Sequence, residues 1–146
     1  MNNIDTAEQG IQVTTVMIER LGGKDVRLHK EGNKRFITFT SPSGKQYKVT
    51  TRTKKSGSWQ TMTTYGKPCL ENHLENEYWV FVDLEPNPPR FYPVPLWWIS
   101  NNIREEHEEY LQRNGGHRKS NDDSKHHAVP LKRIKSWDNQ WKSMDL

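Results

Sequence analysis

The residues of this chain whose types and spacing suggest chemistry are a set of cations and one tryptophan between positions 45 and 59. The set comprises Lys45, Lys48, Arg52, Lys54, Lys55 and Trp59. Cations along a strand and its exit loop can clamp phosphates, and an aromatic ring can stack on an unpaired base. The segment therefore suggests nucleic-acid binding. An ordinary solvated turn, with Trp59 folded back on a sheet, has the same composition and is the alternative.

Two further groups of residues have the types found in metal sites. Asp83 and Glu85 are two apart on an expected strand and would share a face. They precede a proline-rich break and have no evident lysine partner, so a solvated strand end is the favoured interpretation. The second group is His117, His126 and His127 with the nearby Asp122 and Asp123. Adjacent histidines rarely bind one ion and no further ligand has zinc-like spacing, so we expect no metal there.

The composition limits the classes of protein to which the chain can belong. Its 146 residues fit one domain, and 22 Lys+Arg against 18 Asp+Glu give a net charge of +4. This charge permits a polyanionic partner without requiring one. Cys69 is the only cysteine, which excludes an intrachain disulfide and suits a reducing cytoplasm. No apolar run approaches the length of a membrane span, so we expect a cytoplasmic protein without a membrane partner.

The pattern of apolar and turn residues predicts a single domain over residues 1–146. Its expected elements are a helix over 6–21, a meander over 25–53, central strands over 78–94, a helix over 95–113 and a tail over 114–146. Thr6 and Gln9 suggest a capping box. The turn "SPSG" predicts that 35–40 and 45–53 pair as an antiparallel hairpin. Residues 54–76 are expected mainly as loop, with a short helix near "CLENHLE", and Pro93 suggests an edge strand.

This order of elements is similar to that of the PD-(D/E)XK nuclease superfamily, the restriction-endonuclease-like fold. The stretch "FITFTSPSGKQYKVTTRTKKSGSW" resembles the hairpin of that superfamily, and "YWVFVDLEPNPPRFYPVPLWWISNNI" resembles the strands and helix that follow it. The resemblance implies an α/β fold with a mixed central β-sheet flanked by helices. It also implies a site in which two acids on adjacent strands hold Mg²⁺ and a lysine orients or deprotonates the nucleophile.

The chain departs from this pattern at the residues that matter for catalysis. Carried over position by position, the first-strand aspartate falls on Ile37, the second-strand acid on Lys48 and the lysine on Thr50. None of these side chains can do what the resemblance implies, so no catalytic residue and no cofactor is expected there. Asp83 and Glu85 are the alternative acids.

The leading hypothesis is a catalytically degenerate, nuclease-like protein that binds DNA, or regulates something that does, in a phage or host-defence setting. The enzymatic alternative is an active Mg²⁺-dependent DNA endonuclease with relocated acids. The third hypothesis is a scaffold that binds a protein partner and no nucleic acid. The target and the oligomeric state have no signature in the sequence.

Overall fold

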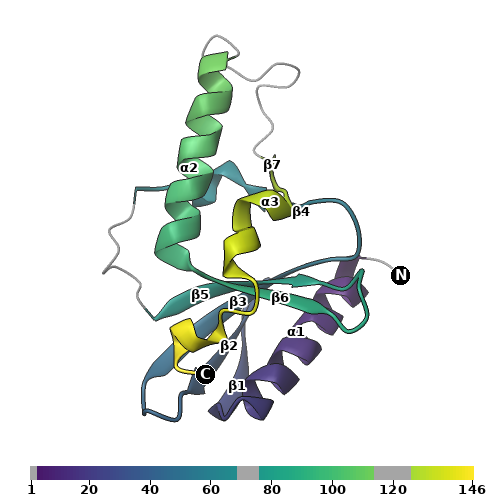
Figure 1. Ribbon diagram of the computed structural model, residues 1–146, viewed down its shortest axis with the longest axis vertical. Coiled ribbons are helices and arrows are strands. Elements are labelled where there is room, and N and C mark those ends of the chain that lie inside the picture. Colours follow the sequence, from purple (N-terminus) through teal and green to yellow (C-terminus); the bar gives the residue numbers. More distant parts are fainter. Residues whose placement is uncertain (1–2, 69–75, 114–125) are drawn as a thin grey trace.

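A five-stranded mixed β-sheet forms the centre of the molecule, and helices flank it (Figure 1). The computed structural model describes residues 3–68, 76–113 and 126–146. The strands, in spatial order, are β1 (Lys24–Glu31), β2 (Lys34–Thr40), β3 (Gln46–Lys54), β5 (Glu77–Asp83) and β6 (Arg90–Pro95). β3 and β5 are parallel and all other neighbours are antiparallel. The predicted fold class, α/β with a mixed central sheet flanked by helices, is confirmed.

The remaining elements lie around this sheet. α1 (Asn3–Arg20) precedes it and α2 (Leu96–Arg113) follows it, while β4 (Trp59–Met62) and β7 (His126–Val129) form a separate two-stranded sheet. The other described elements are α3 (Leu131–Ile134) and the 3-10 turns η1 (Thr63–Tyr65), η2 (Lys135–Trp137) and η3 (Trp141–Met144). None of the helices in the described ranges is long and apolar enough to cross a membrane.

The hairpin of β2 and β3 follows from the turn chemistry of the segment between them. Gly44 has a φ of +92°, a conformation that glycine adopts without a steric penalty. The amide of Ser41 donates to the carbonyl of Lys45 at 2.7 Å, which closes the turn. The strands then pair in antiparallel register, with Thr38 opposite Lys48. The predicted hairpin is confirmed.

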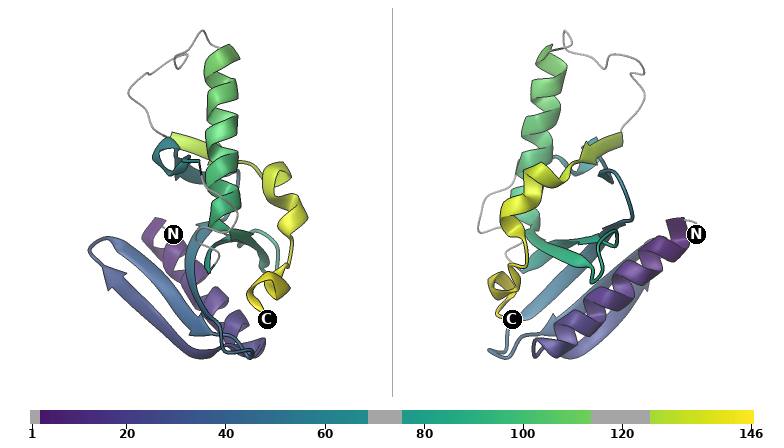
Figure 2. Two further views of the ribbon diagram at one scale, coloured as in Figure 1. Left: turned by 90° about the vertical axis from the view of Figure 1, so that its left-hand side faces the viewer. Right: turned by 45° about the vertical axis from the view of Figure 1, so that its right-hand side comes forward.

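The two faces of the sheet carry separate cores. On one face, apolar residues of β2, β3 and β5 pack with Ile18 and its neighbours on α1. Gly10 permits close packing of α1, because a Cβ at this position would lie 1.8 Å from Oγ1 of Thr53. On the other face, residues of β5 and β6 such as Trp79 and Tyr92 pack against α2, β4, β7 and α3. Figure 2 shows α1 along the meander and α2 rising from the other side of the sheet.

The described residues cover this second face only in part. Its core residues come from β4, β5, β6, α2, β7 and α3. On the same side of β1, β2 and β3, the side chains of His29, Phe36, Thr38 and Lys48 are only half-buried. Within residues 3–68, 76–113 and 126–146, this half of the face is therefore only partly covered.

The residues that follow α3 are tied to the meander and to β5. The hydroxyl of Tyr47 donates to Oδ2 of Asp145 at 2.9 Å, and the hydroxyl of Ser43 donates to the same oxygen at 3.0 Å. The hydroxyl of Tyr78 donates to the carbonyl of Ser143, also at 2.9 Å. These bonds hold η3 against the first core.

Several sequence-based expectations require correction. The expected loop over 54–76 contains β4, in which Trp59 and Thr61 point inward. β7 was likewise missed within the expected tail, and α1 begins at Asn3, so Thr6 lies inside the helix rather than at its cap. The helix expected near "CLENHLE", Cys69, and His117 with its neighbouring aspartates lie outside the described residues.

Candidate nucleic-acid interface

The candidate site is a cleft at the point where β2 and β3 part. Their pairing ends at Ile37 and Val49, whereas β3 continues beside β5 to Lys54 and β2 continues beside β1 to Lys34. A hollow of about 450 Å³ occupies this region, with residues of α1 among those that line it. We call it the β2–β3 cleft. Its functional side chains are Phe36 of β2, Lys48, Thr50 and Arg52 of β3, Tyr65 of η1 and Trp79 of β5.

The guanidinium of Arg52 lies against two aromatic rings that form one wall of this cleft. The centre of its guanidinium lies 4.3 Å from the ring centroid of Trp79 and 4.9 Å from that of Tyr65. The two rings are nearly perpendicular, at 84°. Nε of Arg52 is buried and has no hydrogen-bond partner among the described residues. The rings therefore orient the guanidinium without neutralising its charge.

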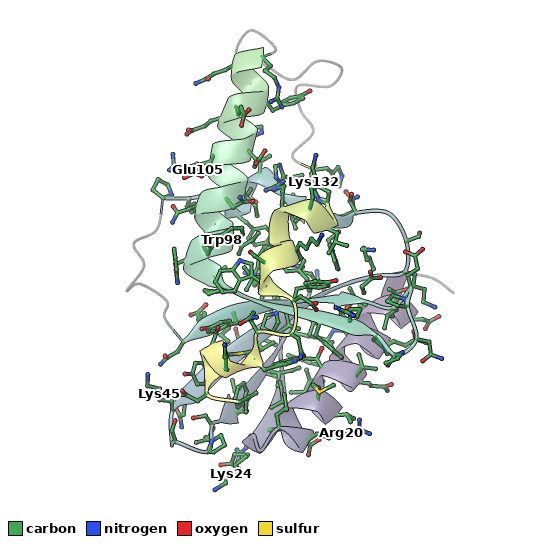
Figure 3. The ribbon with its side chains drawn as sticks, viewed as in Figure 1. Arg20, Lys24, Lys45, Trp98, Glu105 and Lys132 are labelled. Carbon is green, nitrogen blue, oxygen red and sulfur yellow. The ribbon has the colours of Figure 1, made fainter. Side chains whose placement is uncertain are left out.

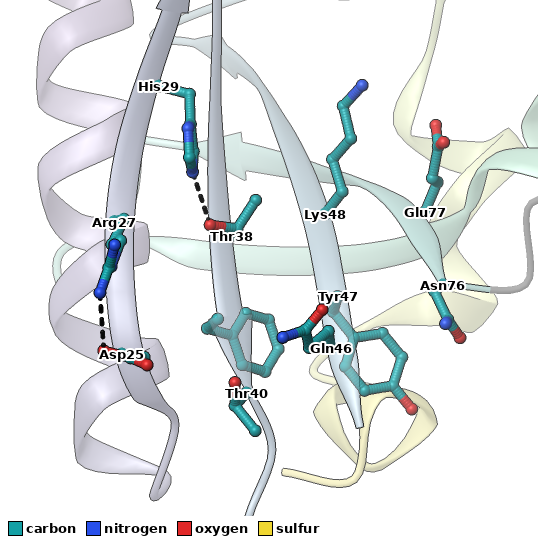
Figure 4. A pocket seen from close by; sticks show the side chains of 11 residues that line it. Asp25, Arg27, His29, Thr38, Thr40, Gln46, Tyr47, Lys48, Asn76 and Glu77 are labelled. Atoms are coloured by element: carbon teal, nitrogen blue, oxygen red, sulfur yellow. Dashed lines mark hydrogen bonds and ion pairs between the residues drawn. The ribbon is translucent and has the colours of Figure 1, made fainter. Parts of the chain in front are cut away.

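Lys48 occupies the opposite side, next to β2. Its Nζ lies 4.5 Å from the ring centroid of Phe36, which in turn stacks on His29 at 4.8 Å. His29 and Thr38 are joined by a hydrogen bond between Nε2 and Oγ1, at 2.7 Å (Figure 4). Figure 4 also shows Lys48 and Glu77 projecting side by side from β3 and β5. Both line a second, adjoining hollow of about 620 Å³, so the open face continues past Lys48.

Lys48 and Arg52 differ from every other shielded cation in the described residues. The buried and half-buried lysines and arginines there are Arg35, Lys48, Arg52, Lys54, Arg104 and Arg133. Arg35, Lys54 and Arg104 pair with carboxylates, and Arg133 donates to the side-chain oxygen of Asn102. The charged groups of Lys48 and Arg52 lie over aromatic rings and, within the described ranges, have no carboxylate at ion-pair distance. Both line the β2–β3 cleft.

Lys54 and Trp59 are not placed as the sequence suggested. Lys54 is 8% exposed, and its Nζ lies 3.3 Å from the carboxylate of Asp83. Trp59 is 1% exposed and donates its indole N–H to the carbonyl of Val82 at 3.0 Å. The ring of Trp59 covers the ammonium of Lys54, at 4.8 Å from the centroid. Both residues belong to the core, so the interpretation with Trp59 folded back on the sheet is the one that fits.

Asp83 and Glu85, the alternative acids, lie next to Lys54, a partner that the sequence did not reveal. Asp83 is buried against Lys54, while the side chain of Glu85 is 64% exposed and lies 4.0 Å from the same ammonium. The amide of Glu85 donates to Oδ1 of Asp83 at 3.0 Å. The interpretation of a solvated strand end without a lysine is therefore wrong for Asp83. The described part of the chain holds no group of three or more metal-ligating side chains.

The assigned motif positions do not share one face of the sheet. Ile37 is 1% exposed and packs in the core beneath α1, whereas Lys48 and Thr50 line the cleft on the other face. The residues of β2 that face the same side as Lys48 are Phe36 and Thr38, because side chains alternate along a strand. Neither has a carboxylate, so the departure from the nuclease pattern holds at these positions as well.

The other predicted cations lie away from the cleft. Lys45 is exposed beside the turn between β2 and β3 (Figure 3). Lys55 is exposed and lines a different hollow, together with Gln9 and Gln12 of α1. The structure thus brings together Lys48 and Arg52 and leaves Lys45, Lys54 and Lys55 elsewhere.

The comparisons with known proteins identify no relative. The chain matches no family model, no curated protein and no solved structure. The geometry of the cleft and the resemblance noted in the sequence are accordingly the basis for assigning a function.

Proposed function

We propose that this protein is a catalytically degenerate, nuclease-like protein that binds DNA in the β2–β3 cleft. The sequence resemblance to the PD-(D/E)XK superfamily supports the nuclease-like part of the proposal. The parting of β2 and β3 supports the choice of site, because it exposes one side of β3 in the segment that the resemblance assigns to the active site.

The observation that carries the proposal is that Lys48 and Arg52 are half-buried and have no carboxylate partner among the described residues. Proteins usually pair shielded cations with carboxylates or other acceptors, as this chain does for Lys54 and Arg104. Two shielded cations that have aromatic contacts instead, in one cleft, retain their attraction for an anion. The phosphates of a nucleic acid are such anions, and Arg can bind them through two parallel hydrogen bonds.

The acids that line the cleft do not favour cleavage. Glu31 and Glu77 are both in its lining, but Glu31 is on β1 and Glu77 is on β5. In a sheet of order β1-β2-β3-β5, three strand spacings separate them, about 14 Å at ~4.8 Å each. Two oxygens that bind one Mg²⁺ lie within about 4 Å of each other, so both side chains would have to extend fully toward each other across β2 and β3. Binding without metal-dependent hydrolysis is therefore the function that the arrangement supports best.

Fluorescence anisotropy with labelled single-stranded and duplex DNA at low salt tests the proposal. Lys48→Ala and Arg52→Ala should each weaken binding by about tenfold, because each removes a charge-assisted contact worth about 1.5–3 kcal/mol. Lys132→Ala is the matched control, since Lys132 is exposed on α3, far from β1 and β2 (Figure 3). The control should bind like the wild type.

Three results would count against the proposal. Unchanged affinity in both cleft variants would place the interface elsewhere. Absence of DNA binding by the wild-type protein would favour the protein-partner scaffold. Cleavage of the same DNA that requires Mg²⁺ or Mn²⁺ would favour the active endonuclease.

A further inference from the structure

Within the cleft, the ammonium of Lys48 and the guanidinium of Arg52 extend toward Thr50. On β3, Lys48 and Arg52 flank Thr50 on the same face, two residues away on either side. The ammonium of Lys48 lies over Phe36, the residue of β2 just beyond the last pair, Ile37 and Val49, and so reaches toward the point where the strands part. The guanidinium of Arg52 lies over Trp79, the residue of β5 directly opposite Thr50. Each long side chain therefore leans along the strand toward Thr50.

Thr50 supplies the third donor of this arrangement. Its side chain is half-buried in the cleft, and within the described residues its hydroxyl has no hydrogen-bond partner. Lys48 offers three N–H donors, Arg52 offers a planar fork, and Thr50 offers one O–H. The site therefore combines two positive charges and several donors around one point.

From this geometry we infer that the β2–β3 cleft binds the terminal phosphate of a DNA strand, a phosphomonoester, rather than an internal phosphodiester. The inference rests on the proposed function and specifies its ligand. A phosphomonoester carries about −1.5 to −2 charges at pH 7 and three terminal oxygens. An internal phosphate carries one negative charge. Lys48 and Arg52, which have no carboxylate partner among the described residues, supply two positive charges for the terminal group.

The walls of the cleft suit the end of a DNA strand. Trp79 and Tyr65 stand behind Arg52, Leu96 at the start of α2 lies beside them, and Ala7 and Ile11 of α1 also line the hollow. A volume of about 450 Å³ accommodates a small ligand and excludes a duplex. A strand that enters over Lys48 meets the aromatic wall next to Arg52, so its terminal group is the part that reaches both cations.

The test compares strands that differ only at their ends. Single-stranded oligonucleotides of one sequence are prepared with a 5′-phosphate, with a 3′-phosphate, with hydroxyls at both ends, and as a closed circle. At least one phosphorylated form should bind about tenfold more tightly than the hydroxyl-ended and circular forms. The two phosphorylated forms show which end the cleft accepts.

The variants assign this preference to the cleft. Arg52→Gln and Lys48→Gln should reduce the ratio of affinities for phosphate-ended and hydroxyl-ended strands to nearly one, and Thr50→Val should reduce it by a smaller factor. Lys132→Gln should keep the wild-type ratio. Thermal unfolding of each variant shows whether it is folded at the temperature of the measurement.

The outcomes separate the inference from the function on which it rests. If the wild-type protein binds all four forms with equal affinity and Arg52→Gln binds none of them, the preference for a terminal phosphate is overturned. The proposed binding of DNA in the cleft would still stand. A preference for phosphate ends that persists in both glutamine variants would overturn it too. If none of the four forms binds, the proposed function itself fails.

Discussion

The ammonium of Lys54 lies 3.3 Å from the carboxylate of Asp83, beneath the indole of Trp59. The parallel register places the two residues directly opposite one another, at the ends of β3 and β5. Both side chains are nearly inaccessible, 8% and 10% exposed. The pair thus joins the meander to the strand next to it, at the far end of β3 from the hairpin turn.

The first prediction concerns the stability that this pair provides. Lys54→Met leaves the buried carboxylate of Asp83 without its cation and should lower the free energy of unfolding by about 3–5 kcal/mol. Urea unfolding followed by tryptophan fluorescence measures the change. Lys55→Met, at the exposed neighbouring position, should change it by less than about 0.5 kcal/mol.

A second variant tests whether the cost comes from the unpaired charge. Replacing both residues, as Lys54→Met with Asp83→Leu, removes both charges and should recover most of the lost stability. A double variant that is as unstable as the sum of the two single variants would show that the residues act independently.

The second prediction concerns the salt dependence of DNA binding. For single strands, each phosphate neutralised contributes about 0.7 to the slope of log affinity against log salt. Lys48→Ala combined with Arg52→Ala should therefore flatten the slope by up to about 1.4, whereas Lys55→Ala should leave it unchanged. Titrations at several salt concentrations measure the slope. Weaker binding with an unaltered slope would mean that the two residues act only by shaping the cleft.

The third prediction separates Trp59 from the interface. Since Trp59 is buried and bonded to Val82, Trp59→Ala should cost about 3–5 kcal/mol of stability, and Trp59→Phe less. At temperatures where the Phe variant is folded, its affinities for single-stranded and duplex DNA should equal those of the wild type. A loss confined to single strands would instead support stacking of Trp59 on a base.

The fourth prediction concerns Tyr78 at alkaline pH. Burial, followed by the nearby Asp145 carboxylate, raises the pKa of Tyr78 to about 12 from the usual 10.0. Between these values the unfolded chain loses the phenolic proton while the folded protein retains it. The free energy of unfolding should therefore decline by about 2–3 kcal/mol as the pH rises from 10 to 12, and be unaffected by this group below pH 10.

Tyr78→Phe is the control for this dependence. It should lose about 1 kcal/mol at neutral pH, because the bond to the carbonyl of Ser143 is absent, and its alkaline decline should be shallower. Part of the decline should remain, because burial also raises the pKa of Tyr92. Identical pH profiles in the two proteins would show that Tyr78 does not titrate differently on folding.

Local features of the fold were predictable from the sequence and long-range pairings were not. The hairpin of β2 and β3 follows from Pro42 and Gly44 in one turn, and β5 follows from a continuous apolar run. No local pattern indicates that β3 pairs with β5 in parallel, or that Thr61 of β4 reaches the carbonyl of His127, 66 residues away. These pairings determine which lysine and arginine side chains remain free of carboxylate partners and can bind an anion.

The candidate site was only partly predictable for the same reason. Alternation along β3 correctly groups Lys48, Thr50 and Arg52 on one face. It also places Lys54 there, but the parallel register sets Asp83 opposite Lys54 and a tryptophan opposite Thr50. The aromatic partner of Lys48 was within reach of the sequence, since Phe36 lies on the strand paired by the predicted turn.

The bonds of Asp145 have a consequence for the order in which the chain folds. They join Asp145 to Tyr47 and Ser43 across 98 and 102 residues, whereas the turn between β2 and β3 closes through Ser41 and Lys45. The entropy lost on closing a loop increases with its length, so the hairpin can form early while η3 must dock late. Substitutions at Asp145 should therefore accelerate unfolding and leave the refolding rate nearly unchanged.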